Sequence, residues 1–576
     1  GAFEIPFIKL KRNILEGRRE YELPDGTIAI LPEAWFARYK HVFEFGSVKN
    51  GVLKIHRQHF SIINEIFEEK GRTISPRLKK LLVPESIPSV NPPTGMKTEL
   101  RKYQLEGLNW LVWLQSAKLG GCLADDMGLG KTVQTLALIL FNKENKVDGR
   151  EMHQRSQLTL FDTEQKGWTS LIVVPASLIY NWENEIRKFT PTLKYFTYKG
   201  NQRRKNISYF GDYDIILTSY HIVRQDIEVF SQFHFHYVVL DESQVIKNPS
   251  SMVFRAVSML KSDYRLVLTG TPIENSLSDL WTQLNFVNPG LLGTLAFFKR
   301  EYARPVEKMR DRKKEDQLRK IIKPFILRRT KEMVAPELPP LTEQTVFCDM
   351  TEEQAEIYEK EKSAVRNSIL KSMEVPGHEQ NAIQVLQGLI RLRQLSNHPA
   401  MVIDDYSGGS GKFETVIRDI ENILAEKHKI LIFSSFVKHL MLYADYFDSQ
   451  KLKYSVLTGS STDRGSIIEK FQIDPDNRIF LISLKAGGVG LNLTSADYVF
   501  LLDPWWNPAA EMQALSRAHR IGQDKSVFVY RYISSSSIEE KIIRLQEKKS
   551  KLAETFVQSN NPLKDIDLKS LLEIIE

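Results

Sequence analysis

Cysteine is scarce in this sequence, which has only Cys122 and Cys348 among its 576 residues. Two cysteines exclude a disulfide framework and a four-cysteine zinc site, and they are typical of a reducing, intracellular compartment. Runs of about 18 or more apolar residues are absent, so no membrane-spanning helix is predicted. The first residues lack a basic region followed by an apolar stretch, so no secretory signal is predicted. Because the chain begins with Gly1 rather than Met, we expect that the natural protein has residues before it.

The charge balance leans to the basic side, with a formal net charge of +8 and an isoelectric point near 9.0. This excess weakly favours a polyanionic partner such as nucleic acid. Hydrophobic residues make up 42% of the 576 residues, which is ordinary for a soluble globular protein. A chain of this length is too long for one hydrophobic core, so at least two domains are predicted.

Short apolar runs rich in β-formers alternate with helical patterns in two successive series. The runs of the first series are 121–124, 171–174, 214–217, 237–240 and 265–268, and those of the second are 429–433, 454–457, 479–482, 498–501 and 527–530. This alternation is typical of βαβ units around a parallel sheet. The sequence therefore predicts an α/β fold with two tandem lobes, each built on a parallel sheet.

The segments around these two series differ in character, and they predict four parts of the chain. Residues 1–95 contain a hairpin-like stretch and form a small accessory N-terminal segment, and residues 537–576 form a C-terminal bracing helix and tail. The first lobe spans 96–345 and the second 346–536, each with a helical insertion. A charged, helical stretch at about 273–425 contains the linker between the lobes.

A glycine-rich segment follows the first predicted strand and opens a helix. Its sequence is Asp126-Met127-Gly128-Leu129-Gly130-Lys131-Thr132. Glycines let the backbone fold around phosphate oxygens, and the amides at the start of a helix point at negative charge. Lys131 can reach the β- and γ-phosphates, and the Thr132 hydroxyl can ligate Mg²⁺. Asp125 stands where the strict phosphate-loop pattern has glycine, so an ordinary glycine turn remains an alternative for this segment alone.

Two acids, Asp241 and Glu242, end the apolar strand at 238–240. One carboxylate at this position can hold Mg²⁺ and its neighbour can orient and deprotonate the attacking water. In the second lobe, Arg517 and Arg520 are three residues apart and share one helix face, which suits the charge of a transferred phosphoryl group. Solvated acids and a solvated basic face are the alternatives, and the combination of all three patterns favours an ATP site.

With these residues in view, the chain resembles the Swi/Snf group of helicase superfamily two from about residue 99 to about residue 558. The segments that carry the resemblance are 100–104, 175–178, 217–220, 241–244, 268–275, 392–399, 485–493, 503–508 and 513–523. The segments 485–493 and 503–508, the second with two tryptophans, are the most specific to this group. The tandem tryptophans resemble the microbial branch more than the large eukaryotic remodellers.

The resemblance implies two RecA-like lobes that bind ATP and Mg²⁺ between them and translocate on double-stranded DNA. It places Gln104 on the adenine base, places the loop residues Asp126 to Thr132, Gly488 and Gln513 at the nucleotide, and makes Arg517 and Arg520 arginine fingers. It implies DNA contacts for Ser177, Thr218, Ser219, Lys485 and Trp506. The predicted function is an ATP-dependent motor that remodels or displaces protein–DNA complexes without obligatory strand separation. Such an enzyme acts in the cytoplasm or nucleoid of a bacterium, or in a eukaryotic nucleus.

Two other functions remain open, a strand-separating DNA or RNA helicase and a nucleotide-gated DNA-binding scaffold. The tandem tryptophans argue against the first, and the presence of Lys131, Glu242 and both arginines argues against the second. The sequence departs from the usual pattern of the group at four positions, which are Asp126 for Glu, Gln244 for His, Ser435 for Gln and Ser516 for Asp. None of these changes removes a catalytic group.

A polar insertion at about 141–168 contains one apolar cluster, Gln157-Leu158-Thr159-Leu160-Phe161. It resembles the peptide by which bacterial replication and repair proteins bind the sliding clamp. In that interpretation Leu160 and Phe161 fill an apolar pocket and Gln157 bonds at its rim, with Leu158 alongside. The alternative is that the cluster folds back onto the first lobe.

Overall fold

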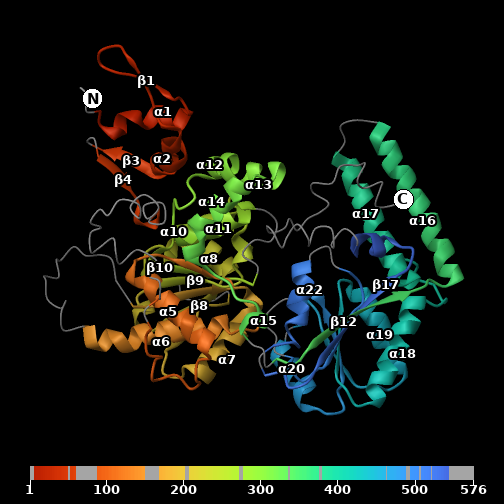
Figure 1. The fold of residues 1–576 in the computed structure, drawn as a ribbon. Coiled ribbons are helices and arrows are strands. Elements are labelled where there is room, and N and C mark those ends of the chain that lie inside the picture. The colour runs from red at the N-terminus through yellow and green to blue at the C-terminus, as the bar shows by residue number, and fades with distance from the viewer. Residues whose placement is uncertain are drawn as a thin grey trace.

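The computed structural model describes residues 5–49, 52–59, 87, 89–149, 168–200, 207–270, 277–334, 338–374, 379–461, 463–487, 493–504, 508–520 and 522–543. Two parallel sheets lie side by side in it, each covered by helices (Figure 1). The prediction of two tandem α/β lobes is therefore confirmed. In the described part of the chain, no helix is both long and apolar enough to cross a membrane.

The sheet of the first lobe has seven strands in the order β11-β5-β10-β9-β6-β8-β7, and every neighbouring pair is parallel. The strands are β5 (Gly121–Leu123), β6 (Ser170–Val174), β7 (Tyr195–Thr197), β8 (Ile215–Ser219), β9 (His234–Leu240), β10 (Lys261–Leu268) and β11 (Ile326–Leu327). All five residues of β6 and of β8 are buried. Continuous apolar runs of this kind are typical of parallel strands that are covered on both faces.

The helices of the first lobe connect these strands and extend beyond them. They are α5 (Lys102–Ser116), α6 (Lys131–Gly149), α7 (Ile179–Phe189), α8 (Tyr220–Gln225), α9 (Ile227–Phe230), α10 (Met252–Met259), α11 (Leu277–Val287), α12 (Leu295–Phe298), α13 (Arg304–Met309), α14 (Arg312–Ile322) and α15 (Lys331–Val334). The group α11–α14 lies between β10 and β11, within the stretch at about 273–425 that is predicted to be helical. One large cluster of buried apolar side chains spans the sheet and its helices.

The sheet of the second lobe has six strands in the order β12-β17-β16-β13-β15-β14, again all parallel. Its strands are β12 (Leu341–Cys348), β13 (Ile430–Ser434), β14 (Tyr454–Leu457), β15 (Ile479–Ser483), β16 (Tyr498–Leu501) and β17 (Val527–Ser534). Its helices are α16 (Glu352–Glu374), α17 (Glu379–Asn397), α18 (Gly411–Ala425), α19 (Val437–Ser449), α20 (Arg464–Ile473), α21 (Leu484–Gly487) and α22 (Pro508–Leu515). Separate apolar clusters cover the two faces of this sheet.

The paired helices α16 and α17 project beyond the second sheet (Figure 1). Their own apolar cluster includes Leu389 and Leu392, and it is completed by Ile538 and Ile542. Residues 538–543 are helical, which agrees with the start of the predicted C-terminal helix. This helix therefore braces the insertion of the second lobe as far as it is described.

The N-terminal segment forms a small unit of its own on the first lobe (Figure 1). It comprises the helices α1 (Lys11–Glu16) and α2 (Glu33–Phe45) and the antiparallel pairs β1 (Glu20–Glu22) with β2 (Ile28–Ile30) and β3 (Gly46–Lys49) with β4 (Val52–Ile55). Its contact with the first lobe includes His59, whose Nε2 lies 2.9 Å from the Leu291 carbonyl oxygen. Gln58 donates to the Pro289 carbonyl at 3.0 Å.

The strand β12 belongs to the second sheet over its whole length, where it pairs with β17. The predicted domain boundary after residue 345 falls inside this strand. We propose to place the division between β11 and β12 instead, because these strands belong to different sheets.

Candidate nucleotide site

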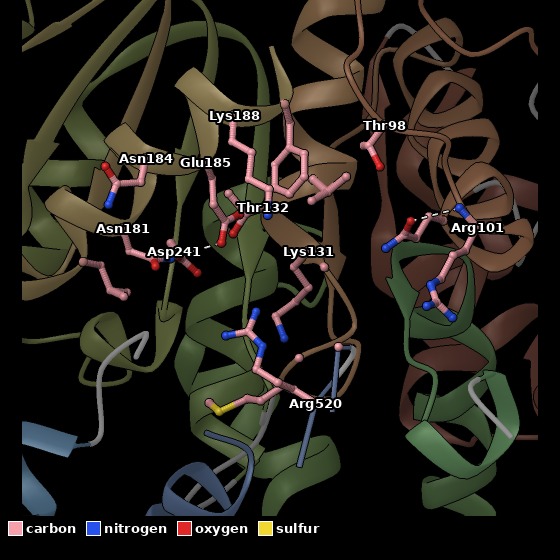
Figure 2. A pocket seen from close by; sticks show the side chains of 18 of the residues that line it. Thr98, Arg101, Lys131, Thr132, Asn181, Asn184, Glu185, Lys188, Asp241 and Arg520 are labelled. Carbon is pink, nitrogen blue, oxygen red and sulfur yellow. Dashed lines mark hydrogen bonds between the residues drawn. The ribbon is translucent and has the colours of Figure 1, made fainter. Parts of the chain in front are cut away.

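A pocket lies between the two lobes at the carboxyl ends of the first sheet's strands, where ligands bind in open parallel sheets. From the first lobe it is lined by Gln104, Met127, Gly128, Gly130, Lys131, Thr132, Asp241 and Glu242, and from the second by Arg517, Arg520 and Gly522. Figure 2 shows the side chains of Lys131, Thr132, Asp241 and Arg520 around this pocket. The structure thus brings together residues that lie almost 400 positions apart in the chain, roughly the span from Lys131 to Arg520.

The phosphate loop turns sharply before α6 begins at Lys131. Gly128 and Gly130 have φ angles of 91° and 78°, a region that only glycine adopts readily. The Lys131 ammonium donates to the carbonyl oxygens of Asp125 at 2.6 Å and Asp126 at 3.3 Å. Burial lowers the pKa of Lys131, and the nearby acids oppose this shift. The loop therefore carries a positive charge in a buried setting, where it attracts an anion strongly.

Asp125, the residue that breaks the strict phosphate-loop pattern, is fully buried behind the loop. Its carboxylate accepts hydrogen bonds from the Arg329 guanidinium at 2.9 and 2.5 Å and from the Gln134 amide at 3.1 Å. Arg329 also donates to the backbone carbonyl of Tyr103. The aspartate therefore fastens the loop to the segment that follows β11, and this role explains an acid at this position.

Gln104, which is predicted to read the base, lies at the start of α5 beside the phosphate loop. Its amide nitrogen donates to the Leu129 carbonyl at 3.2 Å, and its amide oxygen accepts from the Arg101 backbone at 3.0 Å. The side chain is buried and lines the pocket. Hydrogen bonds within the protein therefore fix the position of the Gln104 side chain at both ends of its amide group.

The two acids after β9 lie opposite Lys131 in the pocket. Asp241 accepts a hydrogen bond from the Trp182 indole at 2.8 Å, and burial together with the Glu242 carboxylate raises its pKa well above the ordinary value. Glu242 has a φ of 48°, which is unusual for a residue with a side chain and recurs at functional sites. Its carboxylate accepts from the Gln244 amide at 2.7 Å. Because Thr269 in turn donates to Gln244 at 3.3 Å, the acids are linked to the end of β10.

The two arginines reach the same pocket from the turn after α22, which ends at Leu515, so the prediction that they share one helix face is wrong. Arg517 is buried, and burial lowers its pKa to about 10 although Glu242 and Asp241 oppose the shift. Arg520 packs against the phosphate loop so closely that a Cβ at Gly128 would lie 2.8 Å from the Arg520 Cβ. The cationic side chains of the second lobe therefore face the acids and the loop of the first.

Several residues of this site were not predicted from the sequence. Glu185, Asn181 and Lys188 line the pocket from α7, and Asn181 donates to Glu185 at 3.2 Å. Burial raises the pKa of Glu185, while Arg520 and hydrogen bonds from Asn181 and Thr132 oppose the shift. The four-residue spacing of Asn181 and Glu185 places them on one helix face, which is the only local signal for them. Arg329 and Lys331, behind the loop, carry no such signal.

The residues predicted to contact DNA fall into two groups. Ser177 is half-buried, but Thr218 and Ser219 are buried. The Thr218 hydroxyl donates to the Tyr198 carbonyl at 2.9 Å, and Ser219 caps the N-terminus of α8. These two side chains therefore form internal hydrogen bonds in this structure, and their contact with DNA stays a prediction. Trp506 lies outside the described residues.

Other predicted site residues also lie beyond what the structure describes. These are Gly488, the side chains of Lys485 and Gln513, and the clamp-like segment with Gln157, Leu158, Leu160 and Phe161. The segment that leads to Trp506 is described up to Pro504, and it is firmly held. Arg393 of α17 donates to the Pro504 carbonyl at 2.7 Å and to Asp503 at 3.3 Å. Asp503 also accepts from Ser434 and Ser435.

Comparison with known proteins finds two family models that match successive parts of the chain. The SNF2-related domain matches residues 103–401, and the helicase conserved C-terminal domain matches residues 412–522. The putative ATP-dependent helicase/translocase YwqA of Bacillus subtilis is 36% identical over 510 residues, which cover 86% of this chain and 53% of that protein. The TATA-binding protein-associated factor MOT1 of Saccharomyces cerevisiae is 35% identical over 564 residues, covering 87% of this chain and 30% of that protein.

A solved structure of a Sulfolobus solfataricus SWI2/SNF2 ATPase core in complex with dsDNA is 35% identical to this chain. It matches 85% of this chain and 99% of that chain with a TM-score of 0.41. The chain spans about half, or less, of the length of the curated relatives it matches. Two parallel-sheet lobes with a nucleotide pocket between them define a helicase-like ATPase. The chain belongs to the SNF2-related family, whose two matched domains indicate an ATP-hydrolysing enzyme.

Proposed function

We propose that this chain hydrolyses ATP between its lobes and uses the resulting lobe movement to translocate along double-stranded DNA. The motor displaces or remodels proteins on the DNA without obligatory strand separation. The observation that carries this proposal is the meeting of Lys131, Asp241 and Glu242 with Arg517 and Arg520 in one pocket. Because the catalytic groups come from both lobes, hydrolysis depends on how the lobes are aligned, and a bound duplex can control that alignment.

Magnesium fits the same pocket, on the chemistry of the groups present. The Thr132 hydroxyl and the Asp241 carboxylate are oxygen ligands of the kind that Mg²⁺ prefers, and both line the pocket. The Asp241 carboxyl is buried and the adjacent Glu242 carboxylate is half-buried, and their repulsion contributes to the raised pKa of Asp241. A divalent cation would neutralise that charge and would supply electrostatic stabilisation of the phosphoryl group. We assign Glu242 to orient the attacking water and Gln104 to hold the base.

DNA as the partner follows from the family and from the charge of the chain. The formal net charge of +8 favours a polyanion, and the named relatives include a putative helicase/translocase and a TATA-binding protein-associated factor. A motor that moves along any sequence needs contacts to the phosphate backbone rather than to bases. An enzyme with this substrate acts inside the cell, in the nucleoid or the nucleus.

The test of the proposal is steady-state ATP hydrolysis without nucleic acid and with duplex DNA, single-stranded DNA or RNA. We expect the largest stimulation with duplex DNA. Equal stimulation by single strands or RNA would favour a strand-separating helicase, and absence of turnover on any of them would favour a nucleotide-gated scaffold.

The arginine pair provides a second test. Arg517→Ala and Arg520→Ala should each retain nucleotide binding and lose DNA-stimulated hydrolysis, because their charge acts mainly in the closed, transition-state geometry. The measurements are nucleotide affinity and turnover on saturating duplex, with Arg418→Ala, at an arginine of the second lobe whose side chain is 68% exposed, as the control. Normal turnover in either finger variant would remove that residue from the catalytic site.

We also propose a sliding clamp as a partner of the segment with Leu160 and Phe161. Such a tether would raise the effective concentration of the motor on newly copied or repaired DNA. Purified bacterial clamp is titrated against the parent chain and against the Leu160→Ala/Phe161→Ala variant. Binding that the variant does not share supports the partner, whereas no binding by the parent, or equal binding by the variant, refutes it.

A further inference from the structure

Lys331 bridges the two lobes outside the nucleotide pocket. It begins α15, just after the last strand of the first sheet, and its side chain is buried. The ammonium donates to the His519 carbonyl oxygen at 2.5 Å and to the Ser516 hydroxyl at 3.3 Å. Both acceptors belong to the turn that carries Arg517 and Arg520. A first-lobe lysine therefore holds the turn that presents the second lobe's arginines.

The same residue is fixed to the phosphate loop on its other side. The Lys331 backbone amide donates to the Asp126 carboxylate at 3.2 Å. A Cβ built on Gly128 would lie 2.8 Å from the Arg520 Cβ and 3.8 Å from the Lys331 Cε. The phosphate loop, Lys331 and the arginine turn thus meet at one place. Because these three parts are in contact, we expect a shift of one of them to move the other two.

A second hydrogen bond holds the arginine turn from the linker. The His519 ring Nε2 lies 2.9 Å from the Pro339 carbonyl oxygen, just before β12 begins. Pro339 and Lys331 stand at the two ends of the short connection between the lobes. The turn is therefore held by hydrogen bonds from both ends of this connection. Of these hydrogen bonds, those of the Lys331 ammonium join the turn to the first lobe.

A buried lysine is costly to the fold unless it is paired. Burial lowers the pKa of Lys331 to about 8, and Asp126 opposes this shift while Arg520 and Arg517 add to it. The Lys331 ammonium lies near two arginines and donates to the His519 carbonyl and the Ser516 hydroxyl. This position suits a group that holds the arginine turn in place.

We propose that Lys331 is a positioning residue. It holds the turn at 516–520 against the phosphate loop and thereby sets the positions of both arginine side chains relative to the bound nucleotide. This inference rests on the proposed function, since it assumes that Arg517 and Arg520 act on the phosphoryl group. Lys331 is not part of the pocket lining, so its effect on the reaction passes through the turn. Opening of the lobes requires that the contacts of the ammonium break.

The main test replaces Lys331 by Met, which keeps the length of the side chain and removes the charge. We expect kcat on saturating duplex to fall by about tenfold or more, because small misplacement of catalytic groups is costly. The KM for ATP should stay within about twofold to threefold, because Lys331 does not line the pocket. Lys331→Arg should restore part of the loss. Met333→Ala, at a side chain that is 70% exposed on the same helix, is the matched control and should match the parent.

A structural role would give a different result. If Lys331 only supports the fold, Lys331→Met should lower the melting temperature and affect kcat and KM together, with no rescue by Arg. That outcome, or a kcat within about twofold of the parent, overturns the proposal.

A double-mutant cycle with Ser516 tests the contact itself. Ser516→Asp places a carboxylate where the hydroxyl now accepts from the Lys331 ammonium. We expect this change to preserve or raise kcat in the parent and to lower it in the Lys331→Met background, because the new carboxylate is then buried without its cation. The same effect in both backgrounds would overturn the proposed contact.

The lobe arrangement provides a measurement that does not depend on hydrolysis. Fluorophores attached to cysteines introduced at Gln232 and Gln450, exposed residues of the first and second lobe, report the distance between the lobes. Without nucleotide or DNA, Lys331→Met should shift the distance distribution, and Met333→Ala should not. If the Arg517 and Arg520 variants lose turnover while Lys331→Met changes neither turnover nor this distance, the role proposed for Lys331 is wrong and the proposed function stands. If the finger variants keep turnover, the proposed function fails.

Discussion

Asp241 is held in a position that is unfavourable for its charged form. Burial and the adjacent Glu242 both raise its pKa, and the indole of Trp182 and the charge of Lys131 offset this only in part. A group with this environment costs the folded protein stability whenever it is ionised. Active sites commonly accept such a cost because the charge is needed for the reaction.

Because ionisation of the buried Asp241 carboxyl is unfavourable, we expect the stability of the folded protein to fall as the pH rises. A carboxyl whose folded pKa is raised binds its proton more tightly when folded, so stability falls as pH rises from the unfolded value, about 3.9, toward neutrality. Asp241→Asn should remove this slope in melting experiments with EDTA. Asp212→Asn, at an exposed carboxylate of the same lobe, should keep the slope of the parent. An unchanged slope in Asp241→Asn would show that the charged form is not penalised.

Lys131 and Glu242 provide the direct test of catalysis at single residues. Lys131→Ala or Glu242→Gln should lower ATP turnover by about 10²-fold or more, as expected for the loss of one preorganised catalytic group. Duplex affinity should change little, because the phosphate contacts along DNA lie elsewhere. Turnover and duplex binding are measured on the same preparations. A comparable loss of DNA binding in both variants would contradict this division of roles.

At the scale of elements, the strands with long apolar runs and the hairpin of β1 and β2 were predictable, and several other strands were not. All ten predicted runs coincide with strands, from β5 at 121–123 to β17 at 527–534. The strands β7, β11 and β12 were missed for physical reasons. β7 and β11 are short and only half-buried, and β12 is mostly exposed, so none has the continuous apolar pattern of a central strand.

The candidate site was predictable where local sequence determines its chemistry. The phosphate loop, the two acids after β9 and the arginine pair each have a short pattern with a physical reason. Glu185, Arg329 and Lys331 could not be identified in this way, because their partners are distant in the chain and only the packed structure brings them together. Ser516, noted in the sequence only as a departure, gains a structural meaning as a partner of Lys331.

The turn of the phosphate loop gives a prediction at the element scale. Gly128→Ala combines strain from a φ of 91° with a methyl group 2.8 Å from the Arg520 Cβ. Gly200→Ala is a matched control, since Gly200 has a φ of 86° and, among the residues that the structure describes, no heavy atom lies within 4 Å of a Cβ built on it. Both should lose about 1–2 kcal/mol of stability, and Gly128→Ala alone should lower DNA-stimulated turnover, by about tenfold. Equal turnover in the two variants would argue against close contact between the loop and the arginine turn.

At the scale of the whole molecule, the proposed translocation requires that force pass from the nucleotide pocket to the segments predicted to contact DNA. In the second lobe, buried charges join α18 to the C-terminal helix and α17 to the end of β16. Lys412 pairs with Glu539 at 2.5 Å, and both side chains are fully buried. Arg393 of α17 fixes Asp503 and Pro504 at the end of β16. Breaking such buried pairs is strongly unfavourable, so this lobe is expected to move as a unit during the cycle.

The rigid anchoring of Pro504 bears on Trp506, two residues further along the chain. The family resemblance places this aromatic side chain against the minor groove, where an amphipathic ring can wedge between base steps. If it transmits force from the anchored segment, Trp506→Ala should keep most of the duplex-stimulated ATP hydrolysis and lose translocation, with a nearly unchanged melting temperature. Translocation is measured as displacement of a protein block from duplex DNA, and strand separation is monitored on the same substrate. Val437→Ala, at an exposed side chain of α19, serves as the control. A large drop in melting temperature would instead make Trp506 a core residue, and displacement that always accompanies strand separation would identify a helicase.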